Sequence, residues 1–180
     1  MHVPPQRRSR SSVGGARGRR LFYDPAVARR QISVVGSGAE HEQRAEAVGR
    51  LLAERGATVV CGGRDEVMAA AARGAKSAGG ATIGILPGES REAANEWIDH
   101  AVVTGIGHAR NLAVAASGDA VIAIGGAWGT LSEIALARVL GRPVVVLDPG
   151  WEVAGEGVVR AQTPQEAVEL ALRLARGAVE

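Results

Sequence analysis

The 180-residue chain has little of three features on which many functional classes depend: cysteine, aromatic side chains and long apolar runs. Its single cysteine, Cys61, excludes an intrachain disulfide and a cysteine metal cluster, and is typical of a reducing, cytoplasmic location. Aromatic residues make up 3% of the chain, too few for a stacking platform for single-stranded nucleic acid. No apolar run approaches the roughly 18 residues needed to cross a membrane, so we expect no membrane contact. The four histidines are not spaced like metal ligands, and we predict neither a metal nor a cofactor.

The net charge of +2 conceals an asymmetry between the first 30 residues and the rest of the chain. Residues 1–30 contain eight arginines and one aspartate, so they carry +7 and the remainder carries −5. Residues 1–20 have almost no apolar side chains, and the short apolar run at 21–23 ends at Asp24 and Pro25, so we predict a disordered Arg-rich tail over 1–30 and a single domain over 31–180. The composition of the tail also fits an organelle transit peptide or a salt-dependent contact with nucleic acid. We expect a solvated extension and no nucleic-acid partner.

From residue 31 onward, short apolar runs alternate with stretches of helical periodicity. The pattern predicts strands at 32–35, 57–61, 81–86, 120–124 and 143–147, with a further short strand as an option at 98–103. Helices are predicted at 40–55, 65–77, 108–117, 130–140 and after a capping box that begins at Thr163. Fully apolar strands between helices predict an α/β fold, a doubly wound Rossmann-like parallel sheet with helices on both faces. Glycines follow several strands, at the sheet edge where such folds bind ligands.

The most informative segment is 124–133, IGGAWGTLSE, in which a predicted strand enters a helix through a glycine turn. Free backbone N–H groups and the positive end of the helix dipole then face one point, which favours phosphate or another anion. Four residues would contribute to such a site through backbone approach or a hydroxyl group: Gly125, Gly126, Gly129 and Thr130.

Glu133 has two competing interpretations. The spacing Thr130-x-x-Glu133 is that of a capping box, in which the carboxylate would accept the Thr130 N–H. Alternatively, the carboxylate faces the cleft, as a base or as an anchor for a ligand hydroxyl. A cation for this cleft is available in residues 104–111, TGIGHARN, where Arg110 suits a bidentate grip on phosphate. In the same segment, His108 either contacts a ligand or caps the turn.

The motif G-G-x-x-G-T-x-x-E over 125–133, with the H-x-R that ends at Arg110, resembles the LOG family over about residues 31–148. Characterised members of that family are Rossmann-like nucleoside 5′-monophosphate phosphoribohydrolases. The resemblance implies a homodimer in which Arg110 and Glu133 form the catalytic pair. We expect the remaining ligand contacts from the glycine turns and their neighbours, namely Gly36, Ser37, Gly62, Gly63, Met68, His108, Asn111, Gly125, Gly126, Gly129 and Thr130.

Other features resemble the branch of this group that contains the molybdenum-cofactor carriers, which bind their ligand without hydrolysing it. They are the stretch 85–88, ILPG, and the stretch 105–111 around Arg110. The chain also departs from the family pattern: Ile124 replaces a proline, Asn111 replaces a lysine, and the second glycine turn carries Asp65 and Glu66 where the family keeps small residues. These two carboxylates would either cap the following helix or repel an anionic ligand.

We therefore expect a nucleotide-type phosphorylated ligand at the carboxyl edge of the sheet. The first hypothesis is hydrolysis of the N-glycosidic bond of a nucleoside 5′-monophosphate to base and ribose 5-phosphate. The alternative is a non-catalytic carrier of a phosphorylated pterin, the molybdenum cofactor.

Overall fold

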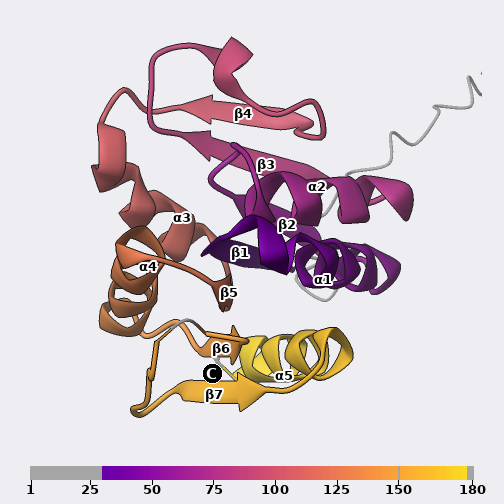
Figure 1. Cartoon of the computed structure of the whole chain (residues 1–180), viewed down its shortest axis with the longest axis vertical. Coiled ribbons are helices and arrows are strands. Elements are labelled where there is room, and N and C mark those ends of the chain that lie inside the picture. The colour runs from indigo at the N-terminus through magenta and orange to yellow at the C-terminus, as the bar shows by residue number, and fades with distance from the viewer. Residues whose placement is uncertain (1–29, 150, 178–180) are drawn as a thin grey trace, which may run out of the picture.

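Seven parallel strands form one sheet in the order β4-β3-β2-β1-β5-β6-β7 (Figure 1). The computed structural model describes residues 30–149 and 151–177, so the predicted tail over 1–29 lies outside the described residues. The strands are β1 (Gln31–Ser37), β2 (Thr58–Cys61), β3 (Thr82–Leu86), β4 (His100–Val103), β5 (Ala120–Gly125), β6 (Val144–Leu147) and β7 (Val158–Ala161). Every strand pair is parallel, as the apolar strand sequences predicted.

Five α-helices and three short 3-10 helices connect the described strands. The α-helices are α1 (Glu42–Glu54), α2 (Val67–Ser77), α3 (Asn111–Ser117), α4 (Trp128–Val139) and α5 (Pro164–Gly177). The 3-10 helices are η1 (Ala39–His41), η2 (Arg91–Ala93) and η3 (Gly107–Arg110). Among the described residues, no helix is long and apolar enough to span a membrane.

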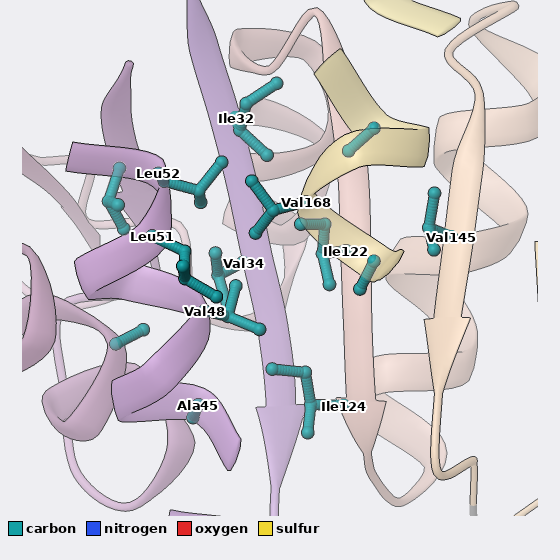
Figure 2. Close-up of a cluster of buried hydrophobic side chains, with 14 of the residues drawn as sticks. Ile32, Val34, Ala45, Val48, Leu51, Leu52, Ile122, Ile124, Val145 and Val168 are labelled. Atoms are coloured by element: carbon teal, nitrogen blue, oxygen red, sulfur yellow. The ribbon is translucent and has the colours of Figure 1, made fainter. Parts of the chain in front are cut away.

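The two faces of the sheet are covered by different helices. Helices α1, α2 and α5 lie on one face and α3 and α4 on the other (Figure 1). Side chains alternate along β1, so Ile32 and Val34 face the first layer while Val35 faces the second. Figure 2 shows the first layer, where Val48 of α1 and Val168 of α5 pack over the strands. This is the doubly wound α/β fold expected from the sequence.

Helices α1 and α2 approach each other at backbone distance. A methyl group on Gly49 would collide with the backbone of Ala71, and one on Gly74 would collide with the backbone of Glu46. The two glycines therefore fix this packing.

The chain order of the strands changes direction at β1, which pairs with β2 on one side and β5 on the other. The β1–β5 register runs from Ile32 opposite Ala120 to Ser37 opposite Gly125. In open α/β sheets, such a switch point leaves a crevice beyond the carboxyl ends of the two strands. A crevice of this kind is therefore expected beside the turns that follow β1 and β5.

One strand was not predicted, and three helices begin at later residues than predicted: α1 at Glu42, α2 at Val67 and α3 at Asn111, against 40, 65 and 108. Strand β7 was not predicted, because its sequence, VVRA, is short and only its last residue is buried. Helix α4 begins at Trp128, two residues before the predicted start. The capping of α5 was predicted correctly at Thr163, whose Oγ1 accepts the Glu166 N–H at 3.2 Å, although the Glu166 carboxylate accepts the N–H of Gln162.

Candidate functional site

A cavity of about 150 Å³ lies at the β1–β5 switch point. Besides Val35, its lining consists entirely of residues singled out from the sequence: Gly36, Ser37, Gly62, Met68, His108, Arg110, Asn111, Gly129, Thr130 and Glu133. They come from the ends of β1 and β2, from α2, and from the η3, α3 and α4 segments. The fold thus brings together turns that are up to about 100 residues apart in the chain.

Three predicted residues do not line the cavity but shape the turns around it. Gly125 and Gly126 have positive φ angles of 57° and 118°, which L side chains rarely adopt. The Gly125 N–H donates to the carbonyl of Asp148 at 3.1 Å, and the Gly126 carbonyl accepts the Trp151 indole N–H at 3.1 Å. Gly63, also at positive φ, donates its N–H to the sulfur of Cys61.

Arg110 is buried in the cavity wall, and its guanidinium group has few hydrogen-bond partners. The residue is 9% exposed, and its Nε and Nη1 atoms have no hydrogen-bond partner among the described residues. The guanidinium lies over Gly62, where any side chain would collide with it and with the sulfur of Met68. An unpaired buried guanidinium costs free energy, so its free donors are available to an anionic ligand.

Glu133 does not cap its helix, so the capping-box interpretation is wrong. Helix α4 starts with Trp128 after an extended N-cap residue, Ala127, which places Thr130 inside the first turn. Glu133 follows one turn later, is 7% exposed, and lines the cavity. Its Oε1 lies 3.7 Å from Nη1 of Arg110, close enough for an ion pair but beyond hydrogen-bond distance.

Burial sets the protonation of Glu133 in the cavity and of Cys61, which precedes the cavity residue Gly62. It raises the pKa of Glu133 to about 7, although the nearby charge of Arg110 acts in the opposite direction. Glu133 therefore exchanges its proton near neutral pH, which suits a general base. Burial also raises the pKa of the Cys61 thiol to about 11 and keeps it protonated.

The remaining lining residues divide into fixed and open side chains. The Asn111 amide donates to Ser132 Oγ at 2.9 Å, which holds α3 against α4. Thr130 is buried against Gly126, where a side chain would collide with it. His108 is exposed and lines both this cavity and a larger hollow of about 670 Å³ beside it.

The larger hollow was not anticipated from the sequence. Its apolar walls come from one side of α3 and α4, with Leu112, Trp128 and Leu136 among them. Trp128 is 72% exposed, and its ring centroid lies 4.7 Å from that of Trp151. The signal in the sequence was the i, i+4, i+8 spacing of Trp128, Ser132 and Leu136, which places them on one helix face.

Of the two interpretations of the acids in the second glycine turn, a cap on α2 is not observed. Asp65 makes no side-chain cap, and the N-cap residue is Glu66, whose side chain does not cap the helix either. Instead, the Glu66 carboxylate accepts the backbone N–H of Gly38 at 2.6 Å. Within the described part of the chain, no group of three or more metal-type ligands is found.

The sequence profile of the SLOG cluster4 family matches residues 29–175. An uncharacterised protein of Archaeoglobus fulgidus is 43% identical over 77% of this chain and 91% of its own length. A cytokinin riboside 5′-monophosphate phosphoribohydrolase of Mycobacterium tuberculosis is 35% identical over 62% of this chain, which spans 64% of that enzyme.

Solved structures of the same fold include molybdenum cofactor binding and carrier proteins. The molybdenum cofactor binding protein of Rippkaea orientalis superimposes with a TM-score of 0.75 at 34% identity, over 82% of this chain and 98% of that one. The molybdenum cofactor carrier protein of Chlamydomonas reinhardtii gives a TM-score of 0.75 at 32% identity, over 82% and 99% of the two chains.

Proposed function

This chain belongs to the SLOG cluster4 family, a LOG-like group related to the molybdenum-cofactor carriers, and we propose that it hydrolyses the N-glycosidic bond of a nucleoside 5′-monophosphate. The products are the free base and ribose 5-phosphate. The curated relatives with this activity support the proposal, as does the chemistry of the residues at the cavity floor.

The ligand is held by groups of complementary charge. The free guanidinium donors of Arg110 take the phosphate or a ribose hydroxyl, and the turn that leads into α4 presents backbone N–H groups at a helix N-terminus. Gly62 keeps the guanidinium in the cavity because it has no side chain. No second permanent positive charge lines the described cavity, so Arg110 carries the electrostatic recognition.

Glu133 performs the chemical step in this proposal. The bond between C1′ and the base nitrogen breaks, and its electron pair leaves with the base, which acquires a proton. The oxygen of a water molecule forms a bond to C1′ and gives its proton to the Glu133 carboxylate, which returns it to solvent. While the bond breaks, the same negative charge stabilises the positive charge that develops on the sugar.

The single observation that carries the proposal is the Arg110–Glu133 pair. Both side chains are buried, they lie 3.7 Å apart without a mutual hydrogen bond, and the carboxyl pKa is about 7. Retention of a phosphate ligand requires the cation but not the acid, because a carboxylate beside a phosphate weakens binding. A buried carboxylate beside Arg110 is therefore better explained by catalysis than by binding of a ligand without turnover.

One observation favours the carrier alternative. This chain spans 98–99% of the molybdenum-cofactor proteins, but only 64% and 50% of the two curated phosphoribohydrolases. The match to the carriers is therefore the more extensive of the two. In this alternative, the same cavity holds the phosphate of a pterin and Glu133 remains protonated.

We also propose that the protein is a homodimer through α3 and α4. The described surface of these helices exposes a set of large apolar side chains, namely Leu112, Trp128, Val139 and Leu140. Apolar side chains grouped in this way on a surface mark an interaction site. A second copy on this face would cover the hollow beside the cavity and exclude water from the ligand.

The proposal is tested by incubating the protein with a panel of nucleoside 5′-monophosphates and separating free base from ribose 5-phosphate by chromatography. We expect release by the unaltered protein and a loss of about 10²–10⁴-fold in Glu133→Gln. Glu169→Gln, which removes an exposed carboxylate from α5, is the matched control and should retain activity.

Full activity in Glu133→Gln would contradict the assignment of the base. No release from any nucleotide, by protein shown to be folded, would exclude the hydrolase. A copurified pterin seen by absorbance or native mass spectrometry would then establish the carrier.

A further inference from the structure

Glu66 adopts a backbone conformation that is unfavourable for a glutamate. It precedes α2 with φ 53° and ψ −125°, a sparsely populated positive-φ conformation outside the left-handed helical region, and such conformations cost an ordinary residue about 1–3 kcal/mol. A glycine would adopt this conformation without strain. Because the side chain does not cap α2, the helix gives no reason for a glutamate here.

The reason lies across the cavity rim, at the turn after β1. The Glu66 carboxylate accepts the Gly38 N–H at 2.6 Å, across 28 residues of chain. Gly38 directly follows the cavity residues Gly36 and Ser37, and Glu66 stands two positions before the cavity residue Met68. The hydrogen bond therefore joins two segments that both line the cavity.

A backbone N–H at the carboxyl end of a parallel strand is a typical donor to an anionic ligand oxygen in this class of fold. Here the protein's own carboxylate occupies that position. Glu40 adds to the effect, because its carboxyl group lies close to Gly38, where an added methyl group would contact it. The imidazole of His41 lies 3.4 Å from the Glu40 carboxylate and 3.3 Å from that of Asp148, and Arg44 is paired with Asp148, which leaves Glu66 as the carboxylate on the Gly38 N–H.

The charge at Arg110, which we call the floor of the cavity, is thus opposite to the charge at the turn after β1, which we call its rim. Arg110 offers an unsatisfied cation at the floor, whereas Glu66 and Glu40 present carboxylates at the first glycine turn. One phosphate group can reach Arg110 and remain apart from the rim. A second phosphate would have to displace Glu66 from the Gly38 N–H or lie beside its charge.

We propose that Glu66 is a specificity-determining residue that restricts the ligand to a single phosphate group, by occupying the anion position at the Gly38 amide. The inference rests on the proposed function only in taking the cavity to hold a phosphorylated ligand. It applies equally to a nucleotide that is hydrolysed and to one that is only bound.

The test compares probes that differ by one phosphate: AMP against ADP, and orthophosphate against pyrophosphate as a pair without a base. Binding is measured by isothermal titration calorimetry at fixed ionic strength. Glu66→Gln retains an oxygen that accepts the Gly38 N–H but removes the charge. Asp65→Asn is the matched control, since it removes the same charge from the neighbouring exposed position, which makes no side-chain cap.

We expect the unaltered protein to bind the one-phosphate probe of each pair more tightly. Glu66→Gln should reduce that preference by about tenfold, the order expected for one carboxylate near a phosphate in water, and Asp65→Asn should leave it unchanged. Glu66→Gly, which also frees the amide and removes the strained side chain, should reduce the preference at least as much as Glu66→Gln.

An unchanged preference in Glu66→Gln, an equal change in Asp65→Asn, or no binding of any probe by any variant would overturn the inference. Failure of the proposed hydrolysis gives a different result. In that case no base is released from AMP, while the preference for one phosphate and its dependence on Glu66 persist.

Discussion

The two faces of the sheet use their buried residues in different ways. The layer of α1, α2 and α5 is filled by aliphatic side chains and small residues, with two glycines at the contact between α1 and α2 (Figure 2). The α3–α4 layer has a smaller apolar cluster. The elements of that layer carry most of the buried polar side chains, namely Arg110, Asn111, Thr130 and Glu133.

The difference shows how one domain separates stability from function. Close packing of apolar groups contributes free energy of folding, whereas a buried ion pair without hydrogen bonds contributes little or costs some. The α1–α2–α5 layer therefore supports the strands, and the α3–α4 layer holds the destabilising groups at their carboxyl ends. Substitutions in the two layers should accordingly affect different measurements.

Among substitutions that leave the Arg110–Glu133 pair chemically unchanged, the largest effect is expected for Gly62→Ala. The methyl group would occupy the place of the Arg110 guanidinium. We expect kcat/KM for base release to fall by about 10²–10³-fold, or about 3–4 kcal/mol of transition-state stabilisation. Gly88→Ala is the control, because a methyl group there meets only open space. Normal activity with the guanidinium still in the cavity would contradict the positioning role of Gly62.

The next effect concerns the pH dependence of stability. The folded-state pKa of Glu133, about 7, lies above the ordinary carboxyl value, so the folded protein binds a proton more tightly than the unfolded chain. This contribution is fully present below about pH 4.5 and is lost as the pH rises to about 7. Relative to Glu133→Gln, the unaltered protein should therefore lose about 2–3 kcal/mol of unfolding free energy between pH 4.5 and pH 8.

Urea unfolding of both proteins at several pH values measures that difference. The substitution also alters the surroundings of Arg110, which shifts the unfolding free energy by an amount that does not depend on pH. The change of the difference with pH therefore still reports the titration of Glu133. A difference that stays constant with pH would show that Glu133 is ionised at an ordinary pKa.

In the opposite layer, Gly49→Ala should reduce stability without affecting the site. The added methyl group collides with the backbone of Ala71, which cannot move without displacing α2. Overpacking of this kind costs about 1–3 kcal/mol, partly offset by the better helix propensity of alanine. We expect a net loss of about 1–2 kcal/mol in urea unfolding. A change in kcat/KM as large as that of Gly62→Ala would contradict the separation of the two layers.

Local patterns in the sequence were sufficient to predict the fold, and the same patterns together with the family resemblance predicted most of the residues that line the cavity. Apolar runs such as the one in β5 identify parallel strands, and glycines after strands identify the ligand edge. The weak pattern of β7 was missed, since a half-buried edge strand has little hydrophobic signal.

The sequence could not resolve the role of Glu133 or Glu66, because each depends on tertiary contacts. The T-x-x-E spacing fits a cap equally well, and only the start of α4 at Trp128 shows that Glu133 enters the cavity instead. Glu66 contacts a backbone amide 28 residues away, which no local pattern encodes. Long-range hydrogen bonds of this kind are visible only when the turns are placed side by side.

The smallest effect on monomer stability, and the clearest on assembly, is expected at the exposed surface of α4. Val139 is 83% exposed, so Val139→Glu should change the unfolding free energy of the monomer by less than about 0.5 kcal/mol. If a second copy covers this face, the buried charge would weaken the dimer and shift sedimentation velocity toward the monomer. Glu169→Gln on α5 should leave the sedimentation profile unchanged. A monomeric unaltered protein, or a dimer whose sedimentation does not change in Val139→Glu, would exclude this interface.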